Sequence, residues 1–131
     1  WRYPREYGPV SPGFSRGAVL GQGGCAVLLA SGTASILGHV SQHLGDVHAQ
    51  LEESLRNLDA LLAEGEARSR SRFSAARCSA LRAYVRHAED APALLPRLQA
   101  AFGPETPIHL LHGDICRREL DVELEGVFAA D

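Results

Sequence analysis

The stretch 25–65 constrains the fold of this chain more than any other part of the sequence. Its apolar run 26–30 is short and uncharged, which is typical of a strand covered on both faces. After Asp46, apolar residues recur at helical spacing and form one stripe for a core: Val47, Leu51, Leu55, Leu58 and Leu62. Asp46 can cap the start of this helix, and Gly65 lies where a helix end favours a left-handed residue. The stretch therefore predicts a buried strand followed by one long amphipathic helix.

The polar residues between this strand and this helix form a candidate binding turn. Ser31, Gly32, Thr33 and Ser35 place hydroxyl groups beside a backbone that lacks a side chain at one position. Backbone N–H groups and hydroxyls that converge in a tight turn can donate hydrogen bonds to an anion. We therefore predict that this turn contributes to a site for a negatively charged ligand.

The remaining patterns predict an α+β fold, with helices on one face of a mixed sheet. Further strands are expected at 14–20, 76–87, 108–112 and 120–128, and a second helix is expected at 89–102, with Pro92 in its first turn. The run 65–74, rich in arginine and serine, is predicted to be a loop. Segment 1–12, rich in aromatic residues and proline, is predicted to be an extended arm or an edge strand laid on the body, and not a helix. The length of 131 residues suits one domain over 1–131.

The composition argues against several classes of function. The net charge of −3 lacks the positive excess that a nucleic-acid binder needs. All basic residues are arginine, so no lysine amine is available for Schiff-base chemistry. Three widely spaced cysteines show no zinc-binding spacing and indicate reduced thiols in a cytoplasmic protein, and no apolar run reaches the length of a membrane span. We therefore expect no nucleic-acid partner, no membrane contact and no metal.

Two carboxylates on the final predicted strand are the candidate acid–base groups. Glu123 and Glu125 share one face of that strand because side chains alternate with a period of two. If the face is covered, burial raises the pKa of one carboxyl, which can then carry protons near neutral pH. If the face is solvated, both are ordinary surface residues.

Histidines and arginines near this strand are the other candidates. His109 and His112 are three residues apart on the preceding strand, so they point to opposite faces and cannot bind one metal ion together. One of them can face the same cleft as Glu123, or both are structural histidines held by hydrogen bonds. Arg117 and Arg118 either anchor a substrate carboxylate or form surface ion pairs.

Several segments resemble signature regions of the Rid (YjgF) family. Asp46, Gln50 and Asn57 match the family's pattern of Asp, Gln and Asn on a helix that follows a strand ending in Ser-Gly. The run SPGF is similar to the family's Gly-Pro-Tyr-Ser segment, with Phe14 in place of the tyrosine, and DVELEGVF resembles the family's closing strand. The resemblance implies a Rid or chorismate-mutase-like fold. It also implies a homotrimer with clefts between neighbouring subunits.

A closer likeness is to the C-terminal half of chorismatases, which hydrolyse chorismate in secondary metabolism, often to prime polyketide biosynthesis. The runs ASGTASILGH, GDVHAQ and HGDICRRELDVELEGV carry this likeness. It implies a hydrolase or lyase that acts without a cofactor on chorismate or a related small carboxylated enol ether or cyclohexadiene. The alternatives are a Rid-type enamine or imine deaminase and a trimeric small-ligand-binding protein that has lost its chemistry.

The resemblance also implies roles for individual residues. Glu123 matches the glutamate that the family uses as general acid and base, with Glu125 as the second candidate. The turn of Ser31, Gly32 and Thr33 matches the part of the family that lines the ligand cleft. Together with the candidates named above, we expect these residues to bind the substrate: Ser31, Gly32, Thr33, Phe14, His109, His112 and Arg117. Rid deaminases hold the substrate carboxylate with an arginine on the penultimate strand. His109 is nearest to that place here, so Arg117 or an arginine from 68–86 is the candidate replacement.

Overall fold

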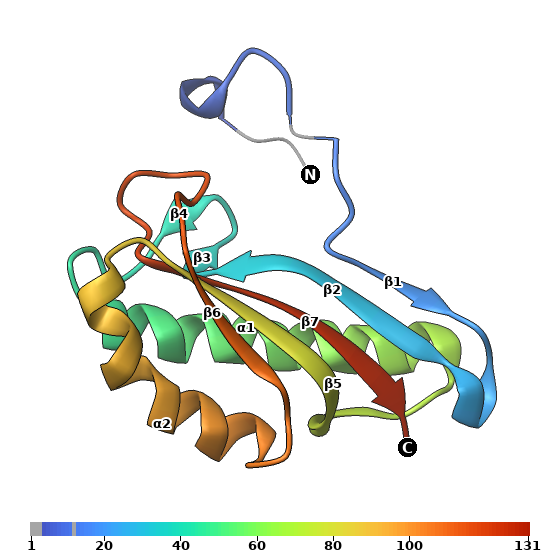
Figure 1. The fold of residues 1–131 in the computed structure, drawn as a ribbon. Helices are drawn as coiled ribbons and strands as arrows, with labels where there is room; N and C mark the ends of the chain where they lie inside the picture. The colour runs from blue at the N-terminus through green and yellow to red at the C-terminus, as the bar shows by residue number, and fades with distance from the viewer. Residues whose placement is uncertain (1–3, 12) are drawn as a thin grey trace.

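A five-stranded mixed sheet forms the centre of the computed structural model, which describes residues 4–11 and 13–131, apart from the side chain of Tyr7 (Figure 1). The strand order is β1-β2-β7-β5-β6, in which β5 and β6 are parallel and the other pairs are antiparallel. The strands are β1 (Gly17–Leu20), β2 (Val27–Ala34), β5 (Phe73–Val85), β6 (Ile108–His112) and β7 (Val122–Ala130). Two helices, α1 (Val47–Ser69) and α2 (Ala91–Phe102), pack on one face. This arrangement confirms the predicted α+β fold.

The main core lies between the sheet and the two helices. Strand residues Leu28, Leu81, Leu124 and Phe128 are buried in it, and the helices supply their apolar stripes: Leu51, Leu55, Leu58 and Leu62 from α1, and Leu94, Leu98 and Phe102 from α2. Among the residues that the structure describes, no α-helix covers the opposite face of the sheet, which we call the outer face. On β7, Val122 and Leu124 point to the core, whereas Glu123 and Glu125 lie on the outer face, as the alternation predicts.

Helix α1 begins as predicted but extends past the expected end. The Asp46 carboxylate accepts a hydrogen bond from the Ala49 N–H at 2.9 Å and caps the first turn. The prediction that Gly65 ends the helix is wrong, because the helix continues to Ser69 and Arg70 adopts the left-handed conformation there. Gly65 instead packs against Leu28 of β2, so closely that a Cβ atom has no room. Its small size serves helix–sheet packing.

The predicted tight turn at 31–35 is also wrong. Strand β2 continues through these residues to Ala34. Its register with β7 shifts after Ala30, which pairs with Gly126, whereas Thr33 pairs with Leu124. Three steps on β2 therefore face two on β7, which defines a β-bulge. The chain turns only afterwards, through a small hairpin of β3 (Ile36–Leu37) and β4 (Val40–Ser41).

Two loop predictions need correction. The run 65–74 is mostly regular structure, because α1 reaches Ser69 and β5 starts at Phe73. In the N-terminal arm, one turn of 3-10 helix covers Arg5–Tyr7, which contradicts the prediction of a wholly extended segment. Pro4 precedes this turn with a φ of −57°, which suits the start of a helical turn. Residues 1–3 and 12 of the predicted arm lie outside the described residues.

The second helix and the last two strands agree with the sequence patterns. A 3-10 turn at Ala88–Asp90 leads into α2, where Pro92 occupies the first turn. Gly103 follows the helix with a φ of 94°.

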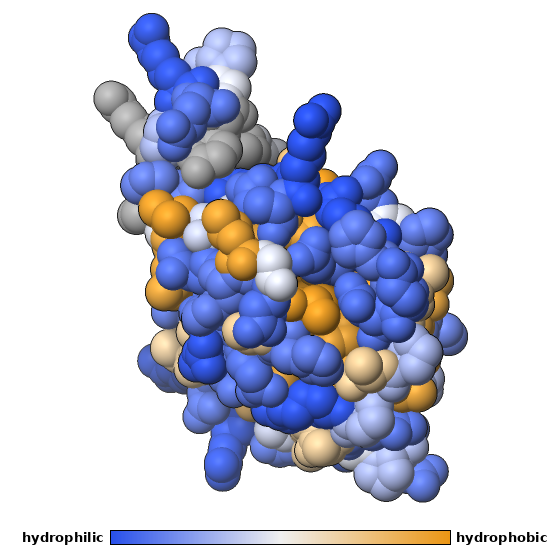
Figure 2. All heavy atoms as spheres, turned by 90° about the vertical axis from the view of Figure 1, so that its left-hand side faces the viewer, coloured by the Kyte–Doolittle hydropathy of each residue, from blue (hydrophilic) through white to orange (hydrophobic). Residues whose placement is uncertain are grey.

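No helix among the described residues has both the length and the apolar character that crossing a bilayer requires. The end of the molecule that carries the hairpin and the start of α2 is mostly hydrophilic, with small separate hydrophobic areas (Figure 2).

Candidate active site

A cavity of about 700 Å³ opens where the bulge of β2 meets two irregular segments, the one before β1 and the segment 113–121 before β7. Its lining comes from four parts of the chain: Glu6, Phe14 and Arg16; Ser31, Gly32, Ala34 and Ile36; Cys116, Arg117, Arg118 and Glu119; and Glu123. A small apolar cluster covers this end of the outer face. Ile115 and Leu120 of segment 113–121 pack there with Ala34, Ile36 and Tyr84. Segment 113–121 therefore forms one wall of the cavity.

Glu123 is the acidic side chain with the most enclosed position in this cavity. Its register partners on the neighbouring strands are Ala34 of β2 and Tyr84 of β5, both of which belong to the covering cluster. Burial raises the pKa of the Glu123 carboxyl above its ordinary value. The Arg16 guanidinium opposes this shift, and the charge of Glu125 adds to it. The carboxyl is thus suited to hold a proton closer to neutral pH than an exposed glutamate.

Gly32 lies directly against this carboxyl. A Cβ atom at Gly32 would lie 2.5 Å from Glu123 Oε1 and 2.7 Å from its Cδ. We predict that Gly32→Val pushes the carboxyl out of its enclosed position and lowers the pKa of Glu123 toward its ordinary value, because burial is the main cause of the raised pKa. NMR titration of the Glu123 carboxyl carbon measures this.

Gly24→Val is the matched control for that variant, because the nearest atom to a Cβ there is 4.0 Å away. We expect it to leave the titration of Glu123 unchanged. The melting temperature of Gly32→Val is expected to stay near that of the parent, since only the end of a flexible side chain must move. An unchanged Glu123 pKa in Gly32→Val would contradict the close packing described here.

The hydroxyls predicted to bind an anion are engaged within the protein. Ser31 Oγ donates to the Ser15 carbonyl at 2.7 Å, and Thr33 Oγ1 donates to the Ser31 carbonyl at 2.9 Å. Ser31 and Gly32 line the cavity, whereas Thr33 lines a smaller adjacent one. These hydroxyls hold the bulge and the segment before β1 in place.

Glu125 has a different environment from Glu123, although both lie on one face. Arg82 Nη1 donates to Glu125 Oε1 at 2.6 Å, and Tyr84 Oη donates to Glu125 Oε2 at 3.2 Å. Burial raises the pKa of the Tyr84 hydroxyl, and Glu125 raises it further. Glu125 does not line the cavity. Because it is ion-paired with Arg82 and lies outside the lining of this cavity, Glu125 is a weaker candidate for proton transfer than Glu123.

The structure separates the two histidines from the cavity. His109 pairs with Arg82 in the β5–β6 register and lies on the outer face, whereas His112 pairs with Val85, whose side chain faces the core. The register therefore agrees with their opposite orientations. Neither histidine lines the cavity with Glu123. Within the described ranges 4–11 and 13–131, no three His, Cys, Asp or Glu side chains are grouped closely enough to hold a metal ion.

Sequence reasoning suggested Arg118 together with Arg117, but it missed Arg16 and Cys116 as cavity residues. Arg16 lies over the Phe14 ring, with its guanidinium carbon 4.5 Å from the ring centroid, and donates to the Gly32 carbonyl at 3.4 Å. Arg117, which the sequence did suggest, donates to the His39 carbonyl at 2.8 Å and to Ser41 Oγ at 2.9 Å. The one available signal for the two missed residues was proximity in the sequence, because Arg16 is two residues after Phe14 and Cys116 directly precedes Arg117.

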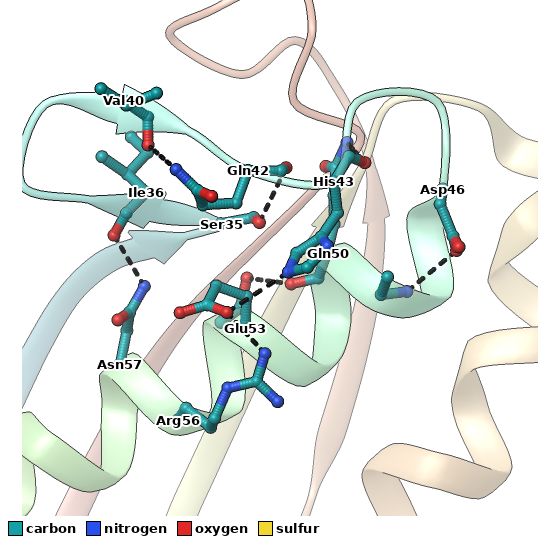
Figure 3. A network of polar contacts seen from close by, with 12 residues as sticks. Ser35, Ile36, Val40, Gln42, His43, Asp46, Gln50, Glu53, Arg56 and Asn57 are labelled. Carbon is teal, nitrogen blue, oxygen red and sulfur yellow. Dashed lines mark hydrogen bonds and ion pairs between the residues drawn. The ribbon is translucent and has the colours of Figure 1, made fainter.

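The three residues of the Asp, Gln and Asn pattern have structural roles. Besides the Asp46 cap, Asn57 Nδ2 donates to the carbonyls of Ala34 and Ile36, at 2.9 and 3.0 Å, and attaches α1 to the hairpin. Gln50 is fully buried and connects α1 to the loop that holds His43 (Figure 3). Its amide nitrogen also donates to the Glu119 carbonyl at 3.0 Å, and its oxygen accepts from the Asp121 N–H at 2.8 Å. Asn57 and Gln50 thus connect α1 to the hairpin and to segment 113–121, both of which contribute residues to the cavity.

The Cys116 thiol reports on the charge of Glu123. Burial is the main cause of a raised pKa for Cys116, and the Glu123 carboxylate raises it further. We predict that Glu123→Gln lowers the pKa of Cys116 and accelerates its alkylation by iodoacetamide at pH 8 by about two-fold or more. The measurement needs a Cys25→Ser background, because Cys25 is exposed. Cys78 is buried with a pKa of about 11, so it does not interfere.

A larger cavity, of about 930 Å³, lies between β1 and the C-terminal half of α1. It contains Arg16, Arg68 and Arg70 over an apolar floor that includes Leu28 and Leu61. Glu64 of this cavity is paired with Arg68 at 2.5 Å. Because this carboxylate is exposed and ion-paired, the smaller cavity, which encloses Glu123, is the better candidate for acid–base chemistry.

The fold is that of Rid proteins. The structure matches a Rid-family protein from Yersinia pestis with a TM-score of 0.73 at 15% identity, covering 93% of this chain and 90% of that chain. It also matches a putative endoribonuclease from Thermotoga maritima with a TM-score of 0.68 at 17% identity, covering 92% and 89%. At these identities the likeness shows the fold alone. No family model matches the sequence.

Chorismatases are similar in sequence as well as in fold. A chorismatase crystal structure matches with a TM-score of 0.86 at 39% identity, over 97% of this chain and 39% of that chain. A 3-hydroxybenzoate synthase from Streptomyces hygroscopicus is 38% identical over 136 aligned residues, and a chorismatase from Streptomyces rapamycinicus is 41% identical over 133. These alignments cover 97% and 98% of this chain, which confirms the resemblance predicted from the sequence. The chain spans 39% and 40% of the length of these two relatives.

Proposed function

We propose that this chain acts on chorismate, or on a related small carboxylated enol ether or cyclohexadiene, as a chorismatase-like enzyme. The observation that carries the proposal is the enclosed Glu123 carboxyl with its raised pKa, located in a cavity that arginines line. The similarity to proteins named chorismatase and 3-hydroxybenzoate synthase supports the choice of substrate. The cytoplasmic location expected from the cysteines stays a prediction.

In the proposed reaction, protonated Glu123 acts as general acid. It transfers its proton to the methylene carbon of the enol ether, which forms a methyl group and leaves an oxocarbenium ion. Water adds to that ion and forms a hemiketal. The hemiketal then collapses: the bond between its central carbon and the ether oxygen breaks, and the hydroxyl proton passes to that oxygen. The products are pyruvate and an alcohol on the carbon ring. The proton that water loses restores the Glu123 carboxyl, so no other reactant and no cofactor is consumed.

Arginines of the cavity are the proposed partners of the substrate carboxylates. Arg16 and Arg118 line it from separate segments, and a guanidinium binds a carboxylate through two parallel hydrogen bonds. Arg117 is a third candidate, although its guanidinium also attaches segment 113–121 to the hairpin. No lysine competes for this role, because the chain has none.

We infer that the protein assembles as a homotrimer through the outer face of the sheet. Leu20 and Leu29 on this face are 56% and 38% exposed, and Val27 and Val127 lie near them on β2 and β7. A sheet face with large exposed apolar residues is more stable when another surface covers it. Light scattering is expected to give the mass of three 14.1 kDa chains, and Leu29→Asp is expected to lower it. A monomeric mass for the parent chain would contradict the trimer.

Release of pyruvate from chorismate tests the proposed function. Lactate dehydrogenase and NADH allow the pyruvate to be followed continuously. We expect its rate of release to increase with the concentration of this protein. No release would contradict the proposal. Ammonia release from freshly generated 2-aminoacrylate would then support a Rid-type deaminase. A rise in melting temperature with chorismate, without turnover, would support a binding protein that has lost its chemistry.

A further inference from the structure

The Arg86 side chain holds segment 113–121 mainly by hydrogen bonds to the segment's backbone carbonyls, in addition to one ion pair at the surface. Arg86 follows the last residue of β5, and its guanidinium donates to three carbonyls of the segment: Leu120 at 2.8 Å, Ile115 at 3.1 Å and Arg117 at 2.9 Å. A fourth bond, of 2.6 Å, goes to the Asp114 carboxylate. The Arg86 side chain is only 16% exposed, whereas that of Asp114 is 95% exposed. The carbonyl bonds are therefore the ones sheltered from water.

The residues that Arg86 holds are those that shape the cavity. Between Ile115 and Leu120 lie four consecutive lining residues, Cys116, Arg117, Arg118 and Glu119. This stretch has no helix or strand of its own, so its conformation depends on side chains that satisfy its carbonyls. One planar guanidinium serves three of them from a fixed direction, which an ammonium group on a flexible chain cannot reproduce.

We propose that Arg86 is a positioning residue, which fixes the cavity wall 115–120 and thereby sets how well the candidate site binds its ligand. The proposal rests on the proposed function for the identity of the ligand, but not for the wall itself. Arg86 does not line the cavity and acts through the segment that it holds.

Amide hydrogen exchange measures the wall directly, without any ligand. The Leu120 N–H is the reporter, because it donates to the Arg117 carbonyl at 3.2 Å and the same carbonyl accepts from Arg86. In Arg86→Ala we expect exchange at Leu120 to accelerate by about ten-fold or more, while amides of β6 keep their protection. Arg86→Lys is expected to remain close to the alanine variant, and millimolar guanidinium is expected to slow the exchange again in Arg86→Ala.

Arg97→Ala is the matched control. Arg97 also forms a two-bond contact, with Glu52 at 2.5 and 3.0 Å, but this contact joins α2 to α1 and involves no residue of the wall 115–120. We expect normal exchange at Leu120 in this variant. Unchanged exchange at Leu120 in Arg86→Ala would overturn the proposal. An equal acceleration in β6 would overturn it too, because that result means a loss of global stability only.

Ligand binding and turnover form the second arm of the experiment. If the chain releases pyruvate from chorismate, Arg86→Ala is expected to raise KM by about ten-fold or more and to change kcat less. A larger effect on kcat than on KM would overturn the binding part of the proposal. If the parent chain releases no pyruvate, the proposed function fails, and the exchange experiment still decides whether Arg86 fixes the wall.

Discussion

Glu123→Gln is expected to lower the rate of pyruvate release from chorismate by about 10²–10⁴-fold, the range that general acid catalysis contributes. Glutamine has nearly the shape of glutamate but cannot donate a proton to carbon. Because the proposed role of Glu123 is that of an acid, we expect the parent chain to be active only while this carboxyl is protonated. Burial raises the pKa of the carboxyl and so extends this active range to higher pH. The activity is therefore expected to fall as the pH rises through the raised pKa. Initial rates of the coupled assay over a pH series measure both effects.

Glu125→Gln is the matched comparison, because it makes the same chemical change two residues away on the same face of β7. It removes the ion pair with Arg82, which is partly exposed, and we expect a much smaller loss of rate. The pH dependence is expected to shift downward slightly, since the charge of Glu125 is one cause of the raised pKa of Glu123. Equal losses in the two variants would show that proton transfer cannot be assigned to Glu123 alone.

Gln50→Leu is expected to destabilise the fold by about 2–4 kcal/mol, because it leaves buried polar groups without a partner. The Asp121 N–H and the carbonyls of His43 and Glu119 all lose a hydrogen bond, at a side chain that is fully buried. A loss of this size lowers the melting temperature of a domain this long by roughly 10 °C. Thermal unfolding followed by circular dichroism measures the change.

Gln99→Leu provides the control for that substitution. Gln99 is exposed on α2, so replacing its carboxamide with the methyl groups of leucine leaves no buried group without a hydrogen-bond partner. We expect a change of melting temperature within about 2 °C, since surface substitutions of this kind have small effects. A comparable loss in both variants would mean that the hydrogen bonds of Gln50 contribute little.

The parts of the fold that repeat a period could be predicted from the sequence. The leucine stripe of α1 and the alternation of β7 depend on local spacing, and both agree with the structure. The shared face of Glu123 and Glu125 follows from the same period. The likeness of DVELEGVF to a family strand then singled out Glu123, which the structure encloses in a cavity.

Other features depend on contacts between distant segments, which no local pattern reveals. The difference between Glu123 and Glu125 arises from Arg82, which lies 43 positions before its partner on a neighbouring strand. The bulge in β2 depends on its register with β7, so Ser31 and Gly32 look like a turn when read alone. Gly65 resembles a helix end for the same reason, because its close neighbour Leu28 is far away in the sequence.

The position of β7 also bears on how the protein is made. It is the last strand in sequence but the middle one in the sheet, with β2 on one side and β5 on the other. A ribosome therefore releases both neighbours before the strand that joins them, and pairs of such large sequence separation form slowly. Because the same strand carries Glu123, the nascent chain can have neither a complete sheet nor the proposed acid–base group until synthesis has passed these residues.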